Sequence, residues 1–119
     1  MNEGMIEKAR DLGRMIGQTD EYKALGRARQ NLDNDREAVE ALNALAELEA
    51  QISSALRAGQ EPSPEAQQAY EASFGKLQGS TVYQALVAAQ TNFDKVLGRV
   101  NDEIGKGIEL GAQSRIILS

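Results

Sequence analysis

The sequence predicts an all-α protein: a long antiparallel helical hairpin or bundle of about five helices that associates with itself. Apolar residues recur every three or four positions along most of the 119 residues, which is the period of one helix face. No stretch alternates apolar and polar residues for long, as a half-buried strand would. Aromatic residues are only 4% of the chain, so the helices are thin and the core is small. A small core favours burial of further surface against a second copy.

The first two helices are expected on either side of a weak point at Gly17-Gln18. The apolar stripe of the first helix is Met5, Ile6, Ala9, Leu12, Gly13 and Ile16. Thr19-Asp20 offers an N-cap for the next helix. The stripe of the second helix is Tyr22, Leu25, Ala28, Arg29 and Leu32. We expect the two helices to be nearly collinear, with a bend near Gly17.

A third helix is expected after the polar break Asp33-Asn34-Asp35. Either Asp35 caps this helix, or Asn34 caps it and Glu37 closes a capping box. Its core-facing positions have near-heptad spacing: Val39, Leu42, Leu45 or Ala46, Leu48 or Glu49, Ile52, Ala55 and Leu56. The helix should end near Ala58, and Gly59 suits the position after the last turn.

The chain is expected to turn back near residues 59–64, where Gln60–Pro64 is its one clear linker. Ser63 is the predicted N-cap of the fourth helix, and Pro64 its first residue. This helix should stop at Gly79, after which Ser80 caps the last helix.

The last helix carries the strongest periodic signal in the chain. Its apolar positions step by three and four residues, as in a coiled-coil seam. We expect a core or self-association seam made of Leu86, Phe93, Val100 and Ile104. If Phe93 is buried there, Phe93→Ala should cost about 3–5 kcal/mol.

The expected domain organisation is a single helical domain over residues 1–111 with a C-terminal tail over 112–119. The tail holds the only β-prone piece, residues 114–119. Its apolar residues Ile116, Ile117 and Leu118 either dock into a groove, of the same chain or of a neighbour, or form a loose terminus.

Missing residue types exclude several kinds of active site. The chain has no Cys and no His, so it lacks thiol nucleophiles, histidine bases and the usual zinc ligands. The run Asp33-x-Asp35-x-Glu37 resembles the start of a calcium loop, but Ala38 and Ala44 stand where Gly and Glu are needed. We therefore expect no enzyme activity, no cofactor and no metal site.

The charge distribution bears on location and partners. The net charge is -5, with about -7 concentrated in residues 32–75, which disfavours a phosphate backbone there. The N-terminal region carries the basic residues Lys8, Arg10, Arg14, Lys23, Arg27 and Arg29. Acidic residues interleave with them, so a solvated helix face is favoured over an RNA site. No apolar run is long enough to cross a membrane, and the N-terminus has no secretory h-region. We expect a cytoplasmic protein that inserts in no membrane.

Several segments resemble the YlbF/YmcA family of bacterial regulators. The segments are residues 7–14 (EKARDLGR), 19–23 (TDEYK), 35–38 (DREA), 87–94 (VAAQTNFD) and 100–104 (VNDEI). The resemblance covers roughly residues 5–110. It implies a hairpin-like helical fold that pairs into dimers or higher oligomers, and a regulatory role. Some members bind an iron–sulfur cluster through cysteines, and this chain has none.

The resemblance implies a non-enzymatic cytosolic adaptor that acts by protein–protein contact. Members are associated with competence, sporulation and biofilm control, and some serve a complex that modulates RNA processing. The expected partners are therefore a ribonuclease complex or sibling family members, together with further copies of the chain. The alternatives are a direct RNA-binding module that uses the N-terminal basic face, and a purely structural oligomeric helical protein.

Overall fold

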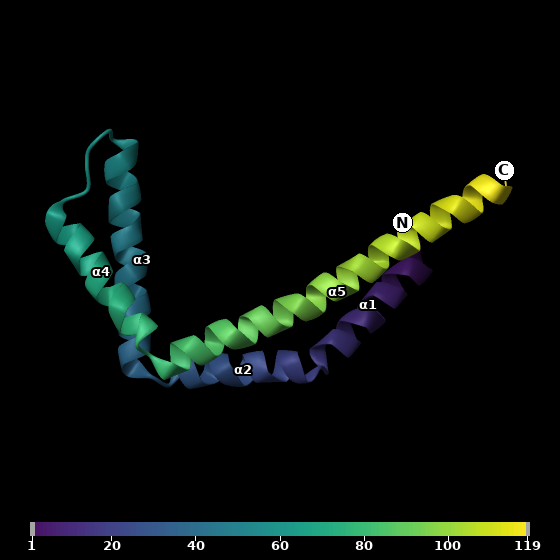
Figure 1. The fold of residues 1–119 in the computed structure, drawn as a ribbon, viewed down its shortest axis with the longest axis horizontal. Coiled ribbons are helices and arrows are strands. Elements are labelled where there is room, and N and C mark those ends of the chain that lie inside the picture. Colours follow the sequence, from purple (N-terminus) through teal and green to yellow (C-terminus); the bar gives the residue numbers. More distant parts are fainter. Residues whose placement is uncertain (1, 119) are drawn as a thin grey trace. The chain divides into compact units, whose positions relative to one another are not determined.

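Five helices make up the computed structural model, which describes residues 2–118 and the side chains of residues 2–113. They are α1 (Glu3–Gly17), α2 (Asp20–Asp33), α3 (Arg36–Arg57), α4 (Pro64–Gln78) and α5 (Thr81–Leu118) (Figure 1). No strand occurs in the part of the chain that is described. The all-α prediction and the number of helices are thus confirmed.

The helices form two compact units. The first unit contains Met1–Leu25 and Ala89–Ser119, and the second contains Gly26–Ala88. In the first unit, α1 and the start of α2 accompany the later part of α5 (Figure 1). In the second unit, α3 packs along α4. The split into a domain over 1–111 and a tail over 112–119 stays a prediction. Helix α5 itself continues to Leu118, while the side chains of Ile116, Ile117 and Leu118 lie outside the described part.

Side-chain caps fix where the helices begin, as the sequence predicted. Asp35 caps α3, because its carboxylate accepts a hydrogen bond of 3.0 Å from the Ala38 backbone N–H. This decides between the two capping schemes in favour of Asp35. The Ser63 hydroxyl accepts from the Ala66 N–H at 3.1 Å, and Pro64 is the first residue of α4. Each cap satisfies a backbone donor that the first turn of a helix leaves free.

The connection between α3 and α4 turns at a glycine. Gly59 has φ +74°, a left-handed conformation that other residues adopt only at a cost. Its N–H donates to the Leu56 carbonyl at 3.1 Å, and the Gln60 N–H donates to the Ala55 carbonyl at 2.8 Å. These bonds close the last turn of α3 as a helix C-terminus of this type requires. The predicted turn at residues 59–64 is therefore confirmed.

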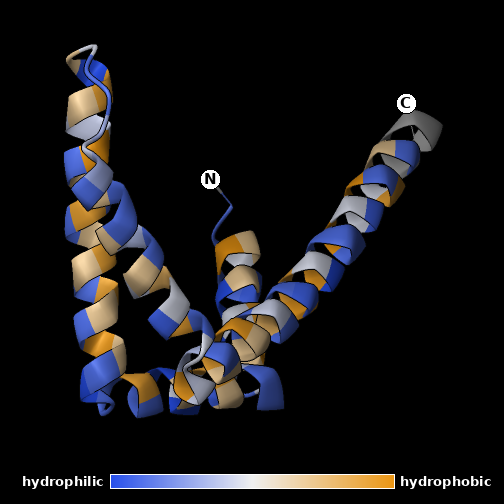
Figure 2. Ribbon diagram, turned by 60° about the vertical axis from the view of Figure 1, so that its left-hand side comes forward, coloured by the Kyte–Doolittle hydropathy of each residue, from blue (hydrophilic) through white to orange (hydrophobic). Residues whose placement is uncertain are grey.

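The tightest packing lies in the second unit, around one leucine of α4. Leu77 is only 1% exposed and contacts Ala41 and Leu45, which are also buried. Tyr70 and Tyr83 pack against this cluster. Small residues on α3 allow α4 to approach closely, and larger side chains fill the remaining space. Figure 2 shows hydrophobic and hydrophilic residues interleaved along the helices. This pattern is typical of helices that pack through one face and expose the other face to solvent.

Candidate protein-interaction groove

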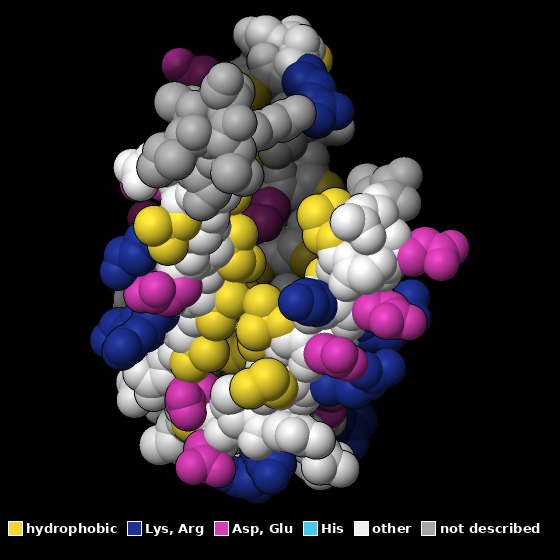
Figure 3. Space-filling view, turned by 90° about the vertical axis from the view of Figure 1, so that its right-hand side faces the viewer, with side chains coloured by type: hydrophobic (Ala, Val, Ile, Leu, Met, Phe, Trp, Pro, Cys, Tyr) yellow, Lys and Arg dark blue, Asp and Glu magenta, His cyan; other side chains and the backbone are white. Residues whose placement is uncertain are grey.

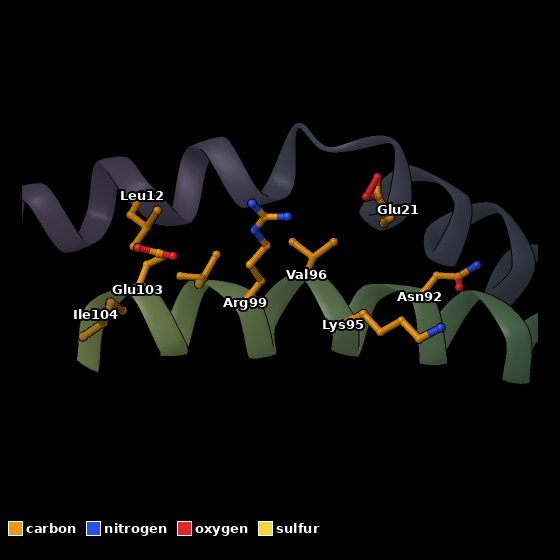
Figure 4. A pocket seen from close by; sticks show the side chains of 9 residues that line it. Leu12, Glu21, Asn92, Lys95, Val96, Arg99, Glu103 and Ile104 are labelled. Carbon is orange, nitrogen blue, oxygen red and sulfur yellow. The ribbon is translucent and has the colours of Figure 1, made fainter. Parts of the chain in front are cut away.

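An open groove of about 820 Å³ lies in the first unit (Figure 4). Helix α1 and the start of α2 form one side, and α5 forms the other. Its apolar lining consists of Leu12, Val96, Val100 and Ile104. Its charged lining consists of Glu21, Lys95, Arg99 and Glu103. In Figure 4, Leu12 points from α1 towards α5, and Val96 and Arg99 point from α5 towards the opposite side.

The break between α1 and α2 determines how these two helices are placed along their side of the groove. The Thr19 hydroxyl donates to the Ile16 carbonyl at 2.7 Å and accepts from the Tyr22 N–H at 3.1 Å. One side chain therefore closes the end of α1 and caps the start of α2. It also fixes Tyr22, whose ring lies 5.3 Å from the ring of Phe93 at a tilt of 55°. This aromatic contact joins α2 to α5 within the unit and is of a favourable geometry.

The first unit leaves much apolar surface uncovered. Helix α1 contains no buried residue, and Leu12 and Ile16 are only half-buried. Ile104 is 47% exposed and Leu110 64% exposed. Figure 3 shows hydrophobic side chains gathered in a recess of the surface, with charged side chains on the surrounding faces. Continuous apolar surface of this kind on a folded protein marks a site of interaction.

The charged residues that α5 contributes to the groove are all exposed to solvent. Glu103 accepts from the Lys106 ammonium at 3.0 Å, and both side chains are more than 60% exposed. Arg14 pairs with Asp11 on the outside of α1. Pairs this exposed contribute at most about 1 kcal/mol each. Among the described residues none is both polar and buried. The groove therefore offers apolar contacts from its aliphatic residues and exposed charges of both signs beside them.

The predicted seam residues do not share one environment. Val100 and Ile104 line the groove, whereas Phe93 lies against Tyr22. Leu86 belongs to the second unit, where it is half-buried. Phe93 is also only half-buried, so the full-burial condition for a loss of 3–5 kcal/mol is not met in the single chain. Their role in self-association stays a prediction.

Sequence reasoning missed the charged members of the groove. Lys95, Arg99 and Glu103 recur every fourth residue and therefore share one flank of α5. Each directly precedes an apolar residue of the lining, in the pairs Lys95-Val96, Arg99-Val100 and Glu103-Ile104. From this repeated pair of a charged and an apolar residue, the charged lining of the groove could have been predicted. The acidic member from α2, Glu21, has no such signal, because its place opposite α5 depends on tertiary structure.

A second hollow, of about 660 Å³, lies among α3, α4 and the start of α5. Asp35, Glu37 and Glu40 line it together with Lys76. Asp35 is engaged in capping, and Glu40 accepts from Arg36 at 3.3 Å. In the described part of the chain, no three acidic, histidine or cysteine side chains are placed to hold a metal ion. We assign these carboxylates to helix capping and to a solvated face.

The N-terminal basic residues are spread around their helices. At 3.6 residues per turn, Lys8 points about 160° away from Arg10 and about 120° away from Arg14 around α1. All three are exposed, and Arg14 is paired with Asp11. A continuous basic face along α1 is thus not formed. Within residues 2–118 no helix combines the length and the apolar character needed to cross a membrane.

Comparisons with known proteins agree with this geometry. The model of a family described as control of competence regulator ComK, YlbF/YmcA, matches residues 5–109. Among solved structures, the chain resembles RicA of Bacillus subtilis, determined by X-ray crystallography in complex with RicF. The TM-score is 0.79 at 18% sequence identity, over 92% of this chain and 96% of that chain. At this identity the likeness establishes the fold. No curated protein sequence matches.

Proposed function

This chain belongs to the YlbF/YmcA family, and on that premise we propose that it is a non-enzymatic regulatory adaptor that acts by contact with other proteins. The observation that carries the proposal is the open groove of the first unit. It offers an apolar lining about two and a half helical turns long on α5, with charged side chains of both signs beside it. Such a surface suits an amphipathic helix laid into a groove.

The partners we propose are sibling members of the same family and, through them, a ribonuclease complex. The similar protein RicA was crystallised with RicF, which supports a partner that is itself a protein. The process under control is then RNA processing, competence or biofilm formation in the cytoplasm. The chain's own contribution is recognition, because its groove presents apolar contacts and no buried polar side chain among the described residues.

Two variants of α5 test this proposal with a matched control. Val96→Glu places a carboxylate in the apolar lining of the groove. Gly98→Glu places the same group two residues further, at an exposed position with open space around it. Each variant is co-expressed with the YlbF/YmcA-family proteins of the same genome, and complex formation is measured by affinity capture and by mass in solution.

We expect the wild-type chain and the Gly98→Glu variant to capture a family member. The Val96→Glu variant should bind the same protein with an affinity lower by at least about tenfold. The capture should survive nuclease treatment. Loss of the complex on nuclease treatment would indicate binding through RNA and contradict the adaptor role. Equal capture of the family member by both variants would show that the groove is not its binding site. Circular dichroism of each variant checks that the helices remain folded.

A further inference from the structure

One flank of the α3–α4 hairpin carries two aromatic rings that the second unit leaves partly open to solvent. The rings of Tyr70 and Phe74 are nearly parallel, at 7°, and their centroids lie 6.3 Å apart. Tyr70 is half-buried against the cluster around Leu77, whereas Phe74 is 41% exposed. A phenylalanine ring has no polar atom to hydrogen-bond with water, so its exposed area is apolar surface that a partner could cover.

Helix α3 extends this apolar surface along the hairpin. Leu42, Glu49 and Leu56 recur every seventh residue, so they lie along one line of α3. The Tyr70 hydroxyl donates to the Glu49 carboxylate at 3.4 Å, which places this line beside the aromatic rings of α4. Leu56 is 62% exposed and Leu42 half-buried. We call the surface made by these residues the aromatic face; its members are Leu42, Glu49, Leu56, Tyr70, Glu71 and Phe74.

The charge on and around the aromatic face is strongly negative. Residues 32–75 contain nine acidic and two basic residues, a net charge of -7. Glu71 lies three positions before Phe74, so its carboxylate is on the same side of α4 as the ring. Glu71 is exposed and forms no ion pair with any described residue. Apolar rings and carboxylates therefore meet on one flank of the hairpin.

The opposite flank of the hairpin has a different character. Glu40 lies about 180° around α3 from Glu49, in the hollow that Lys76 of α4 also lines. Glu40 accepts from Arg36 at 3.3 Å, so acidic and basic side chains are mixed there. None of the six members of the aromatic face is basic. The two flanks therefore differ in the partner that their charge would attract.

We propose that the aromatic face of the α3–α4 hairpin binds an arginine-bearing, net basic segment of another protein. A guanidinium group is planar, so it can stack on the ring of Phe74 while its N–H groups donate to a neighbouring carboxylate. Lysine suits this surface less well, because its ammonium is a compact and strongly hydrated charge. The two leucines of α3 would cover apolar side chains of the same segment.

The negative charge separates this occupant from two others. A nucleic-acid backbone would be repelled by it, because such binding depends on neutralising phosphates. The aromatic face of a second copy carries the same charge and would be repelled as well. The inference goes beyond the adaptor function proposed above, because it assigns a second surface, in the other unit, and a partner of different chemistry.

Synthetic peptides serve as the probes, and the full-length chain is titrated with them. One short peptide alternates arginine with leucine and alanine. Its two counterparts carry lysine or citrulline in place of arginine; citrulline keeps the shape of the side chain and removes its charge. Binding is measured by isothermal titration calorimetry. The arginine peptide should bind about two- to fivefold more tightly than the lysine peptide, and at least about fivefold more tightly than the citrulline peptide.

Two variants of Phe74 test the role of the ring. Phe74→Leu keeps an apolar side chain and removes the aromatic face, so the preference for arginine over lysine should disappear. Phe74→Trp keeps a ring, and the preference should persist or increase. The chain contains no tryptophan, so the new indole also reports binding by its own fluorescence. Circular dichroism checks that both variants remain helical.

A matched pair of α3 variants tests the carboxylate. Glu49→Gln and Glu47→Gln change the net charge equally, both positions are exposed, and they lie about 160° apart around the helix. At about 100 mM salt the screening length is about 10 Å. Glu49→Gln should then weaken binding of the arginine peptide about two- to fivefold, whereas Glu47→Gln should change it by less than about 1.5-fold.

Four results would overturn the proposal. They are equal affinity of the wild-type chain for the arginine and lysine peptides, an arginine preference that persists in Phe74→Leu, equal effects of Glu49→Gln and Glu47→Gln, and a lower mass of Phe74→Leu in solution, which would assign the face to a second copy. The adaptor function is judged separately, from the capture of a family member. A chain that captures such a member without preferring the arginine peptide refutes only the aromatic-face proposal. A chain that prefers the arginine peptide and captures no family member refutes only the adaptor.

Discussion

The replacement of Leu77 by alanine is the sharpest test of how this small-cored protein is stabilised. Leu77 is 1% exposed and is the largest fully buried side chain among the described residues. It packs against Ala41 and Leu45 of α3 and against the two tyrosines Tyr70 and Tyr83. The variant removes three carbon atoms from the centre of the second unit and adds no polar group.

The size of the effect follows from the loss of burial and from the cavity left behind. Each buried methylene-sized group contributes about 0.8 kcal/mol, so the three carbons contribute about 2.4 kcal/mol. A cavity that does not collapse adds about 24 cal/mol for each Å³. Ala41 has no side chain long enough to fill the space, so we expect a total of about 3–4 kcal/mol. For 119 residues this lowers the melting temperature by about 12–16 °C.

The assay compares two leucines that undergo the same chemical change. Leu56→Ala on α3 is the control, because Leu56 is 62% exposed and lies in the same unit. Its expected cost is below about 0.5 kcal/mol. Unfolding is followed by circular dichroism against temperature and against urea. Equal losses for the two variants, or a loss below about 1 kcal/mol for Leu77→Ala, would refute the assignment of the core.

Further substitutions test two backbone positions, the aromatic contact and a helix cap. Gly98→Ala should stabilise the protein by about 0.5–1 kcal/mol, because it lies inside α5 with open space around it. Gly59→Ala should destabilise it by about 1–2 kcal/mol, because φ is +74° there; urea unfolding of both variants checks the opposite signs, and equal signs would contradict them. Phe93→Ala and Tyr22→Ala should show a coupling free energy of about 0.5–1.5 kcal/mol in a double-mutant cycle, and zero coupling would mean that the rings do not meet in solution. Asp35→Ala should cost about 1 kcal/mol of the free energy of unfolding while Asp35→Asn costs little, since both Asp and Asn accept from the Ala38 N–H; equal losses would argue against capping.

Local features of this protein were readable from the chain because their causes lie within a few residues. The cap at Ser63, the turn at Gly59 and the start of α3 just after the polar run at residues 33–35 follow from side chains and backbone preferences that act on the nearest turn. The choice between Asn34 and Asp35 as the cap of α3 could not be made this way, because both residues can accept the same bonds. The backbone geometry of α3 decided it.

Only one side of the candidate groove could be predicted from the sequence. The apolar stripe of α5 indicates a contact face, and the structure places two of its residues, Val100 and Ile104, in the groove. The stripe does not say which helix stands opposite. Phe93 lies against Tyr22, which is 71 positions earlier in the chain, and this pairing depends on how α2 leaves the break after α1.

The sequence by itself determined the helical class, the number of helices, the turn between α3 and α4 and the family, because periodicity, turn residues and family segments are properties of neighbouring residues. Only the tertiary structure decided which of the apolar residues become core. The stripes of α3 and α4 meet and bury Leu77, whereas α1 contains no buried residue although its stripe is as regular. The physical reason is that burial depends on the surface that a distant part of the chain supplies, and the first unit supplies too little of it.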